Sequence, residues 1–371
     1  MSQTLSASIS PEHIPMLLII GFAVFFGSIG GRIFQKLRIP QVVGYITIGL
    51  VAGESGLRLI SKETVTSLDP FTYFALGIIG FMIGGELHRD VFRKYGRQFF
   101  AILLAEGLGA FILVGLLTGG AALAVGVDPV ISAALGVMFG AVSTATAPAA
   151  TVNVLWEYKT RGVLTTSVFA IVALDDALAL ILYSAGASVA AMLTGDGSQG
   201  WGAQFGEAAY ELAGGTVLGV AAGFGLNFAL RQVRDQEKSL TFIIGAVAAV
   251  IGLARLTGVA MILSAMTLGV TVANLAPRHS KRAFETVENF APPIYVLFFV
   301  LVGAHLDVHG MPGWMWALTL PYILGRSAGK ILGANIGGRL AGAPRTVSKY
   351  LGLCLFSQGG VAVGLAILAS G

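Results

Sequence analysis

Long apolar stretches, separated by short polar connections, occupy nearly the whole chain. A helix needs about 20 mostly apolar residues to cross a bilayer, whereas a membrane-spanning β-barrel shows alternating segments of about 10 residues. Only the first pattern occurs here. It predicts an all-α, polytopic membrane protein with twelve spans, at residues 12–34, 39–57, 70–87, 98–125, 129–156, 162–193, 205–231, 239–254, 258–276, 289–306, 314–341 and 347–370.

The overall composition narrows the class of protein further. The 371 residues are 55% hydrophobic and 11% charged, whereas a soluble domain carries about a quarter charged residues. A single water-soluble globule, a coiled coil and a nucleic-acid binder are therefore excluded. The one cysteine, Cys354, excludes an intrachain disulfide framework. No basic residue precedes the first apolar stretch, which is also too long for a signal-peptide core, so we expect it to remain in the protein.

Basic residues alternate between the two sets of connections. Eighteen of the 23 Lys and Arg residues fall at six alternate connections, and only Arg58, Lys62 and Arg255 fall at the opposite set. Because cytoplasmic loops carry an excess of Lys and Arg, this distribution supports the span count and predicts an external N-terminus. The remaining two, Arg326 and Lys330, lie inside a predicted span.

Acidic residues also lie inside predicted spans. Asp175 and Asp176 are central in 162–193, and Glu106 lies within 98–125. A charge at mid-bilayer costs at least about 2.5–3.5 kcal/mol, so pairing across helices or access to water must offset that cost. Adjacent helical residues point about 100° apart. One aspartate can therefore pair with Lys330 or Arg326 while the other faces a cavity; Glu106 fits either a cavity-lining or a packing role.

Two spans are interrupted near their middles. Ser143, Thr144, Thr146 and Pro148 interrupt 129–156, and the sequence Ser357-Gln358-Gly359-Gly360 interrupts 347–370. Unwound backbone at membrane depth is tolerated where it is buried in protein or lines a cavity. Broken helices at corresponding positions in two halves are the best sequence indication of a transporter site at the midplane. We therefore expect these breaks to lie beside the intramembrane charges.

Small residues predict close packing in span 314–341. Its glycines recur every four residues and so share one helical face, a spacing that lets helices approach closely in lipid. Most of them are expected to be packing positions, at Gly325, Gly329, Gly333 and Gly337.

Four segments together resemble the monovalent cation/proton antiporter superfamily, in particular its sodium/proton exchangers of the paired-aspartate bacterial branch. Residues 39–57 are similar to the family's second helix, 81–87 to its third and 293–303 to its tenth, and the fourth segment is the Asp175-Asp176 pair.

The resemblance implies a specific architecture. It predicts two inverted six-helix repeats with crossed discontinuous helices, divided into a core domain and a dimerisation domain. The first repeat would span 12–193, with core spans in 98–193, and 205–231 would be a linker helix. The second repeat would span 239–370, with core spans in 289–370. Because the family has thirteen helices, we expect the final one to be missing from this sequence. A homodimer is also implied.

The same resemblance implies roles for the charged residues. Asp176 would take the transported ion, and Asp175 would pair with Lys330, for which Arg326 is the rival. Apart from the resemblance, a sodium ion prefers oxygen ligands, so Thr146, Ser143 and the carbonyls near Pro148 are further candidate ligands. Glu106, inside a span, and Glu86, near a span end, are possible accessory residues.

The implied function is exchange of Na⁺ (or Li⁺) for H⁺ by alternating access, electrogenic, without enzymatic activity or a cofactor. A K⁺/H⁺ antiporter, or an organic-anion symporter on a similar fold, is the alternative. The expected location is the inner (plasma) membrane of a bacterium.

Overall fold

The structure, a computed structural model, describes residues 15–194, 201–233, 235–275, 277–306 and 313–358. All secondary structure among these residues is helical. The first half contains α1 (Met16–Lys36), α2 (Gln41–Ala52), α3 (Lys62–Ser67), α4 (Asp69–Glu86), α5 (Arg89–Ala124), α6 (Pro129–Ser143), α7 (Pro148–Glu157) and α8 (Val163–Thr194). The second half contains α9 (Trp201–Gln232), α10 (Gln236–Thr257), α11 (Met261–Leu275), α12 (Pro277–Phe290), α13 (Pro292–Ala304), α14 (Gly313–Leu340), α15 (Arg345–Tyr350) and the short 3₁₀-helix η2 (Leu351–Leu355).

Local chemistry sets several helix ends. The Asp128 side chain accepts hydrogen bonds from the first backbone N–H groups of α6, and Asp235 does the same for α10. Proline occupies the first position of both α6 and α7, where its missing N–H has no helical partner in any case. At the end of α10, Gly258 adopts φ 69°, a left-handed conformation that favours glycine.

The outer faces of the helices carry exposed apolar side chains. Leu17, Phe228 and Leu256 are 82%, 68% and 81% exposed, as expected of side chains that contact lipid. Among the described residues, six helices are long and apolar enough to cross a membrane, or seven if the bent pair Lys281–Phe290 and Pro292–Ala304 forms one span. The prediction of an all-helical, polytopic membrane protein is confirmed.

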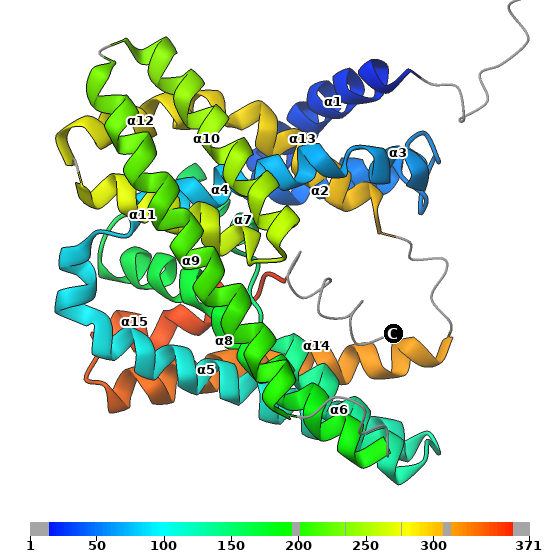
Figure 1. Ribbon diagram of the computed structural model, residues 1–371. Helices are drawn as coiled ribbons and strands as arrows, with labels where there is room; N and C mark the ends of the chain where they lie inside the picture. The colour runs from blue at the N-terminus through cyan, green and yellow to red at the C-terminus, as the bar shows by residue number, and fades with distance from the viewer. Residues whose placement is uncertain (1–14, 195–200, 234, 276, 307–312, 359–371) are drawn as a thin grey trace, which may run out of the picture.

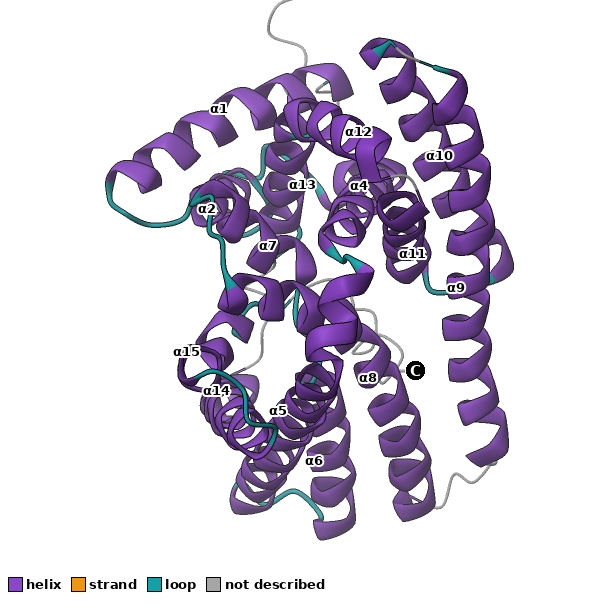
Figure 2. Cartoon of the chain, turned by 90° about the vertical axis from the view of Figure 1, so that its left-hand side faces the viewer, coloured by secondary structure: helices purple, strands orange, loops and turns teal. Residues whose placement is uncertain are grey.

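The helices form two bundles, which we name by their places in Figure 1. The lower bundle contains α5, α6, α8, α14 and α15, and the upper bundle contains α1, α2, α4 and α10–α13. Figure 2 shows the same division from the side, with the long α9 running past both bundles. Helix α9 contacts α10 and α11 above and α8 below, whereas α7 lies between the bundles and contacts α2, α4 and α8.

The closest packing in the lower bundle joins α14 to α5. A Cβ atom on Gly329 would lie 2.5 Å from the Ala110 Cα, and one on Gly333 would lie 2.5 Å from the Glu106 Cα. Both glycines belong to the predicted small-residue face of α14. Their absent side chains allow the backbones to touch, as the spacing predicted.

The predicted span 129–156 consists of two helices, α6 and α7, separated at the interruption that the sequence predicts. The last predicted span is described only as far as Gln358. Other elements differ from the sequence prediction. Helix α5 begins at Arg89, inside the basic connection. Helices α3 and α12 were not predicted, because neither is apolar enough to stand out as a span.

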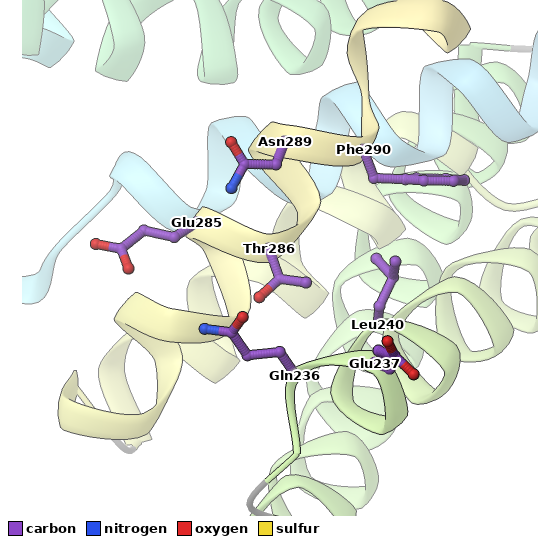
Figure 3. A pocket seen from close by; sticks show the side chains of 7 residues that line it. All are labelled: Gln236, Glu237, Leu240, Glu285, Thr286, Asn289 and Phe290. Carbon is purple, nitrogen blue, oxygen red and sulfur yellow. The ribbon is translucent and has the colours of Figure 1, made fainter.

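Helix α12 is amphipathic rather than apolar. Val287 is fully buried and Phe284 stacks on Phe81 of α4 with ring centroids 4.7 Å apart, whereas Lys281 and Glu285 face outward. A groove of about 420 Å³ separates α12 from the start of α10 (Figure 3); its lining residues are Gln236, Glu237, Leu240, Glu285, Thr286, Asn289 and Phe290. No predicted site residue lines this groove.

Candidate ion-binding site

Two non-helical segments cross in the lower half of the molecule. The first, residues 144–147, separates α6 from α7, and the second, residues 356–358, follows η2. The Ala147 N–H donates to the Ser357 carbonyl at 3.0 Å, and the Thr151 and Ser357 hydroxyl oxygens lie 2.5 Å apart. Pro148 begins α7, so the break ends where proline can start a new helix. The crossing brings distant parts of the sequence into direct contact.

Arg326 of α14 binds both broken segments and is 4% exposed. Its guanidinium donates to the Ser143 and Ala145 carbonyls at 3.0 and 2.9 Å, and to the Phe356 and Ser357 carbonyls at 2.7 and 3.2 Å. These carbonyls belong to the unwound backbone and the ends of α6 and η2, where the helix dipoles are negative. The arginine therefore neutralises two helix ends rather than pairing with an aspartate.

Lys330, one turn further along α14, binds two carboxylates. Its ammonium lies 2.6 Å from Glu106 Oε2 and 3.0 Å from Asp175 Oδ2, and it donates to the Thr144 carbonyl at 2.5 Å. Lys330, Glu106 and Asp175 are all fully buried. Lys330 thus donates hydrogen bonds to Asp175 and the Thr144 carbonyl and forms an ion pair with Glu106, whose two carboxylate oxygens have no hydrogen-bond partner among the described residues. Of the two cations proposed from sequence, Lys330 is the one that contacts Asp175.

Asp176 has a different environment from its neighbour. Both of its carboxylate oxygens are buried and have no hydrogen-bond partner in the described part of the chain, and the same holds for the Thr146 hydroxyl. Buried polar groups are nearly always hydrogen-bonded, so these unpartnered oxygens need an explanation. Their chemistry is suited to a small cation, because hard cations prefer oxygen ligands.

Other polar residues near the crossing have hydrogen-bond partners for their side chains. Gln358 donates to the Val142 carbonyl at 3.0 Å and exchanges hydrogen bonds with the Tyr322 hydroxyl of α14. The Ser143 and Thr144 hydroxyls donate to carbonyls within α6, at Gly140 and Ala141. The sequence analysis did not single out Tyr322 or Thr151, because hydroxyl groups are common in membrane helices and only their partners distinguish these two from ordinary packing positions.

The remaining predicted residues lie elsewhere. Glu86, at the end of α4, interacts with the Trp156 indole of α7 and makes no contact with the Lys330 cluster. Gly359 and Gly360 lie outside the described residues.

A second polar contact joins α7 to the upper bundle. The Glu157 carboxylate accepts a hydrogen bond from the Gln41 N–H at the start of α2 at 2.9 Å, and Trp156 stacks on Tyr295 of α13 with centroids 5.9 Å apart. Both contacts lie at the α7 end nearest the basic connections. They link the second half of the broken helix to the neighbouring bundle.

The sequence matches the family described as sodium/hydrogen exchanger, transmembrane, over residues 21–371. The chain belongs to this family.

Two curated relatives are similar to this chain. The Na⁺/H⁺ antiporter NhaS5 of Synechocystis sp. is 31% identical over 90 residues, covering 22% of this chain and 13% of that protein. The glutathione-regulated potassium-efflux system protein KefC of Shigella sonnei is 28% identical over 280 residues, covering 73% of this chain and 42% of that protein. The chain thus matches less than half the length of either relative.

A solved structure has the same fold. The sodium proton antiporter MjNhaP1 from Methanocaldococcus jannaschii superposes with a TM-score of 0.67 and 17% identity, over 95% of this chain and 85% of that chain. The predicted fold class, inverted repeats with crossed discontinuous helices, is confirmed by this match together with the all-helical architecture. The exchanger family is one of membrane transporters, and this chain is an integral membrane protein.

Proposed function

We propose that this exchanger-family chain moves a monovalent cation against protons by alternating access, with Asp176 carrying each in turn. The observation that carries the proposal is the pair of buried, unpartnered carboxylate oxygens on Asp176. Its neighbour Asp175 pairs with Lys330, and Lys330 donates to the first of the two broken segments at the Thr144 carbonyl. Thr146, whose hydroxyl is also buried and unpartnered, is the proposed second ligand. Both groups would be satisfied when a cation or proton is bound.

Competition at one carboxylate is sufficient for obligatory exchange. A proton and a metal ion cannot occupy the same oxygens of Asp176 together, so binding of one requires release of the other. An ionised carboxylate without a partner is costly to hold away from water. The site can therefore reorient with either ligand bound but not while empty. The lower bundle, which holds Asp176, would move against the upper bundle.

Sodium is the first candidate for the cation. The paired aspartates and the names of NhaS5 and of the MjNhaP1 structure favour Na⁺, and Li⁺ would bind in the same way. Potassium is the second candidate because KefC, named as a potassium-efflux protein, matches 280 residues of this chain. An organic anion is disfavoured as the substrate, because the buried carboxylates of the site outnumber its buried cationic side chains.

Exchange would move net charge if Asp175 also releases a proton when the cation enters. The 3.0 Å pair between Asp175 and Lys330 supports such coupling, because a proton on Asp175 would weaken it. Transfer of one charge is worth about 2.3 kcal/mol per 100 mV, so an imposed membrane potential would change the exchange rate. We further propose a homodimer through the upper bundle, in a bacterial inner membrane, with the N-terminus outside.

Reconstituted vesicles with an internal pH dye test this function. Addition of Na⁺, Li⁺ or K⁺ outside vesicles that contain the wild-type protein should alkalinise the lumen, because cation entry drives protons out, and the active cation identifies the substrate. Asp176→Asn should reduce this flux to the level of empty vesicles while the exposed variant Glu63→Gln retains it. Normal cation-driven proton flux in Asp176→Asn would refute the assignment.

A further inference from the structure

The cluster around Lys330 contains one more carboxylate than exchange at Asp176 requires. Glu106 lies 2.6 Å from the lysine ammonium, closer than Asp175 at 3.0 Å, and is itself fully buried. Arg326 is occupied by four backbone carbonyls. Lys330 is therefore the one buried cation, among the described residues, that compensates both Glu106 and Asp175.

The two carboxylates reach Lys330 from helices that are attached to α14 in different ways. Glu106 lies on α5, whose backbone touches α14 at Gly329 and Gly333. At this distance neither helix can rotate toward the other, or carry a side chain at either glycine, without a steric clash. Asp175 lies on α8, which contacts α5 and α6 but packs on α14 through no such backbone contact. The Glu106–Lys330 pair thus joins two helices whose backbones touch, whereas the Asp175–Lys330 pair joins α14 to α8, which packs mainly on α5 and α6.

From this geometry we infer that Glu106 is a fixed counter-ion that holds Lys330 through the transport cycle and so allows Asp175 to leave the lysine. A lysine with a single carboxylate partner would be left buried and unpaired whenever that partner turned away, which is strongly unfavourable. With Glu106 in place, Lys330 keeps a partner. Asp175 can then take up a proton and leave the lysine, and when it releases that proton on cation entry its negative charge adds to that of the neighbouring Asp176.

This inference rests on the proposed function and assigns Glu106 as a positioning residue that acts through Lys330. It predicts that removing the Glu106 charge ties Asp175 to the lysine. The charge beside Asp176 then becomes less negative, and attraction for the cation falls. A residue that only filled space would change stability and the amount of folded protein, but not the cation concentration at half-maximal rate.

The test compares Glu106→Gln, Glu106→Asp and the exposed control Glu63→Gln in reconstituted vesicles over a series of Na⁺, Li⁺ or K⁺ concentrations. Glu106→Gln should raise the KM for the transported cation about tenfold, with a smaller change in maximal rate. Glu106→Asp, which retains the charge, should give a KM between those of the wild type and Glu106→Gln. An unchanged KM in Glu106→Gln would overturn the inference.

Thermal unfolding of purified protein provides a second test that does not depend on transport. Asp175→Asn should fold, because Glu106 still pairs with Lys330. The double variant, Glu106→Gln with Asp175→Asn, should lose far more stability than the sum of the losses in the two single variants. A loss of stability in the double variant equal to that sum would overturn the inference. If Glu106→Gln alone does not fold, Asp175→Asn decides: a folded protein supports the inference and an unfolded one contradicts it.

The two proposals fail in distinguishable ways. Absence of cation-driven proton flux in the wild type would reject the proposed exchange, while the unfolding data would still test the pairing. The role of Glu106 alone would be rejected by three results together: no exchange in Asp176→Asn, a wild-type KM in Glu106→Gln, and a loss of stability in the double variant equal to the sum of the single losses.

Discussion

At the scale of single residues, Arg326 and Lys330 differ although they lie one turn apart on α14. The arginine uses a planar group with five donors to bind carbonyls on both broken segments. The lysine uses a compact ammonium with three donors to hold two carboxylates and one carbonyl. Sequence alone left open which of them pairs with Asp175. Their donor geometry explains the division, since only a guanidinium can reach four separate carbonyls.

Arg326→Lys is therefore expected to be a severe substitution. A lysine in this position has three donors for four carbonyls, and each buried acceptor left without a partner costs about 1–3 kcal/mol. The melting temperature of the purified protein should fall by several degrees and exchange should be largely lost. Arg339→Lys, an exposed change on the same helix, is the matched control. A melting temperature equal to that of the control would show that the four bonds contribute little.

At the scale of helices, close contact between α5 and α14 positions the cluster. The backbones touch at Gly329 and Gly333, and this brings Glu106 within reach of Lys330. A side chain on either glycine would push the helices apart and lengthen the ion pair.

Gly333→Ala tests this packing. Its Cβ would lie 2.5 Å from the Glu106 Cα, and because that neighbour is backbone it cannot rotate away. We expect less folded protein and a higher cation KM in what remains. Gly245→Ala on α10 adds a methyl group with nothing within 4 Å and serves as control. Equal yield and KM in both variants would contradict the packing argument.

The elements show what the sequence could and could not predict. Pro148 and the polar residues around it predicted the first break, because proline cannot continue a helix, and the glycine spacing predicted a close neighbour for α14. The identity of that neighbour could not be predicted, since spacing on one helix does not specify its partner. For the same reason Glu106 was consistent with both a cavity and a packing role until α5 was placed beside Lys330. Helix α12 was missed because its apolar face is narrow.

At the scale of the whole molecule, the charged cluster lies in the lower bundle and the exposed apolar helices surround it. Glu157 and Trp156 of α7 connect this bundle to α2 and α13. Movement of one bundle against the other, as exchange requires, would have to break or reorganise these contacts. The similarity to MjNhaP1 shows the fold in which this movement would take place.

The central claim is that a cation and a proton compete for Asp176, and the pH dependence of the cation KM in vesicles tests it most directly. Acidification fills the carboxylate with protons, so the KM should rise as pH falls, approaching tenfold per pH unit for one competing proton, while the maximal rate at saturating cation changes little. A KM that stays constant across pH, with only the maximal rate changing, would contradict competition at a shared site.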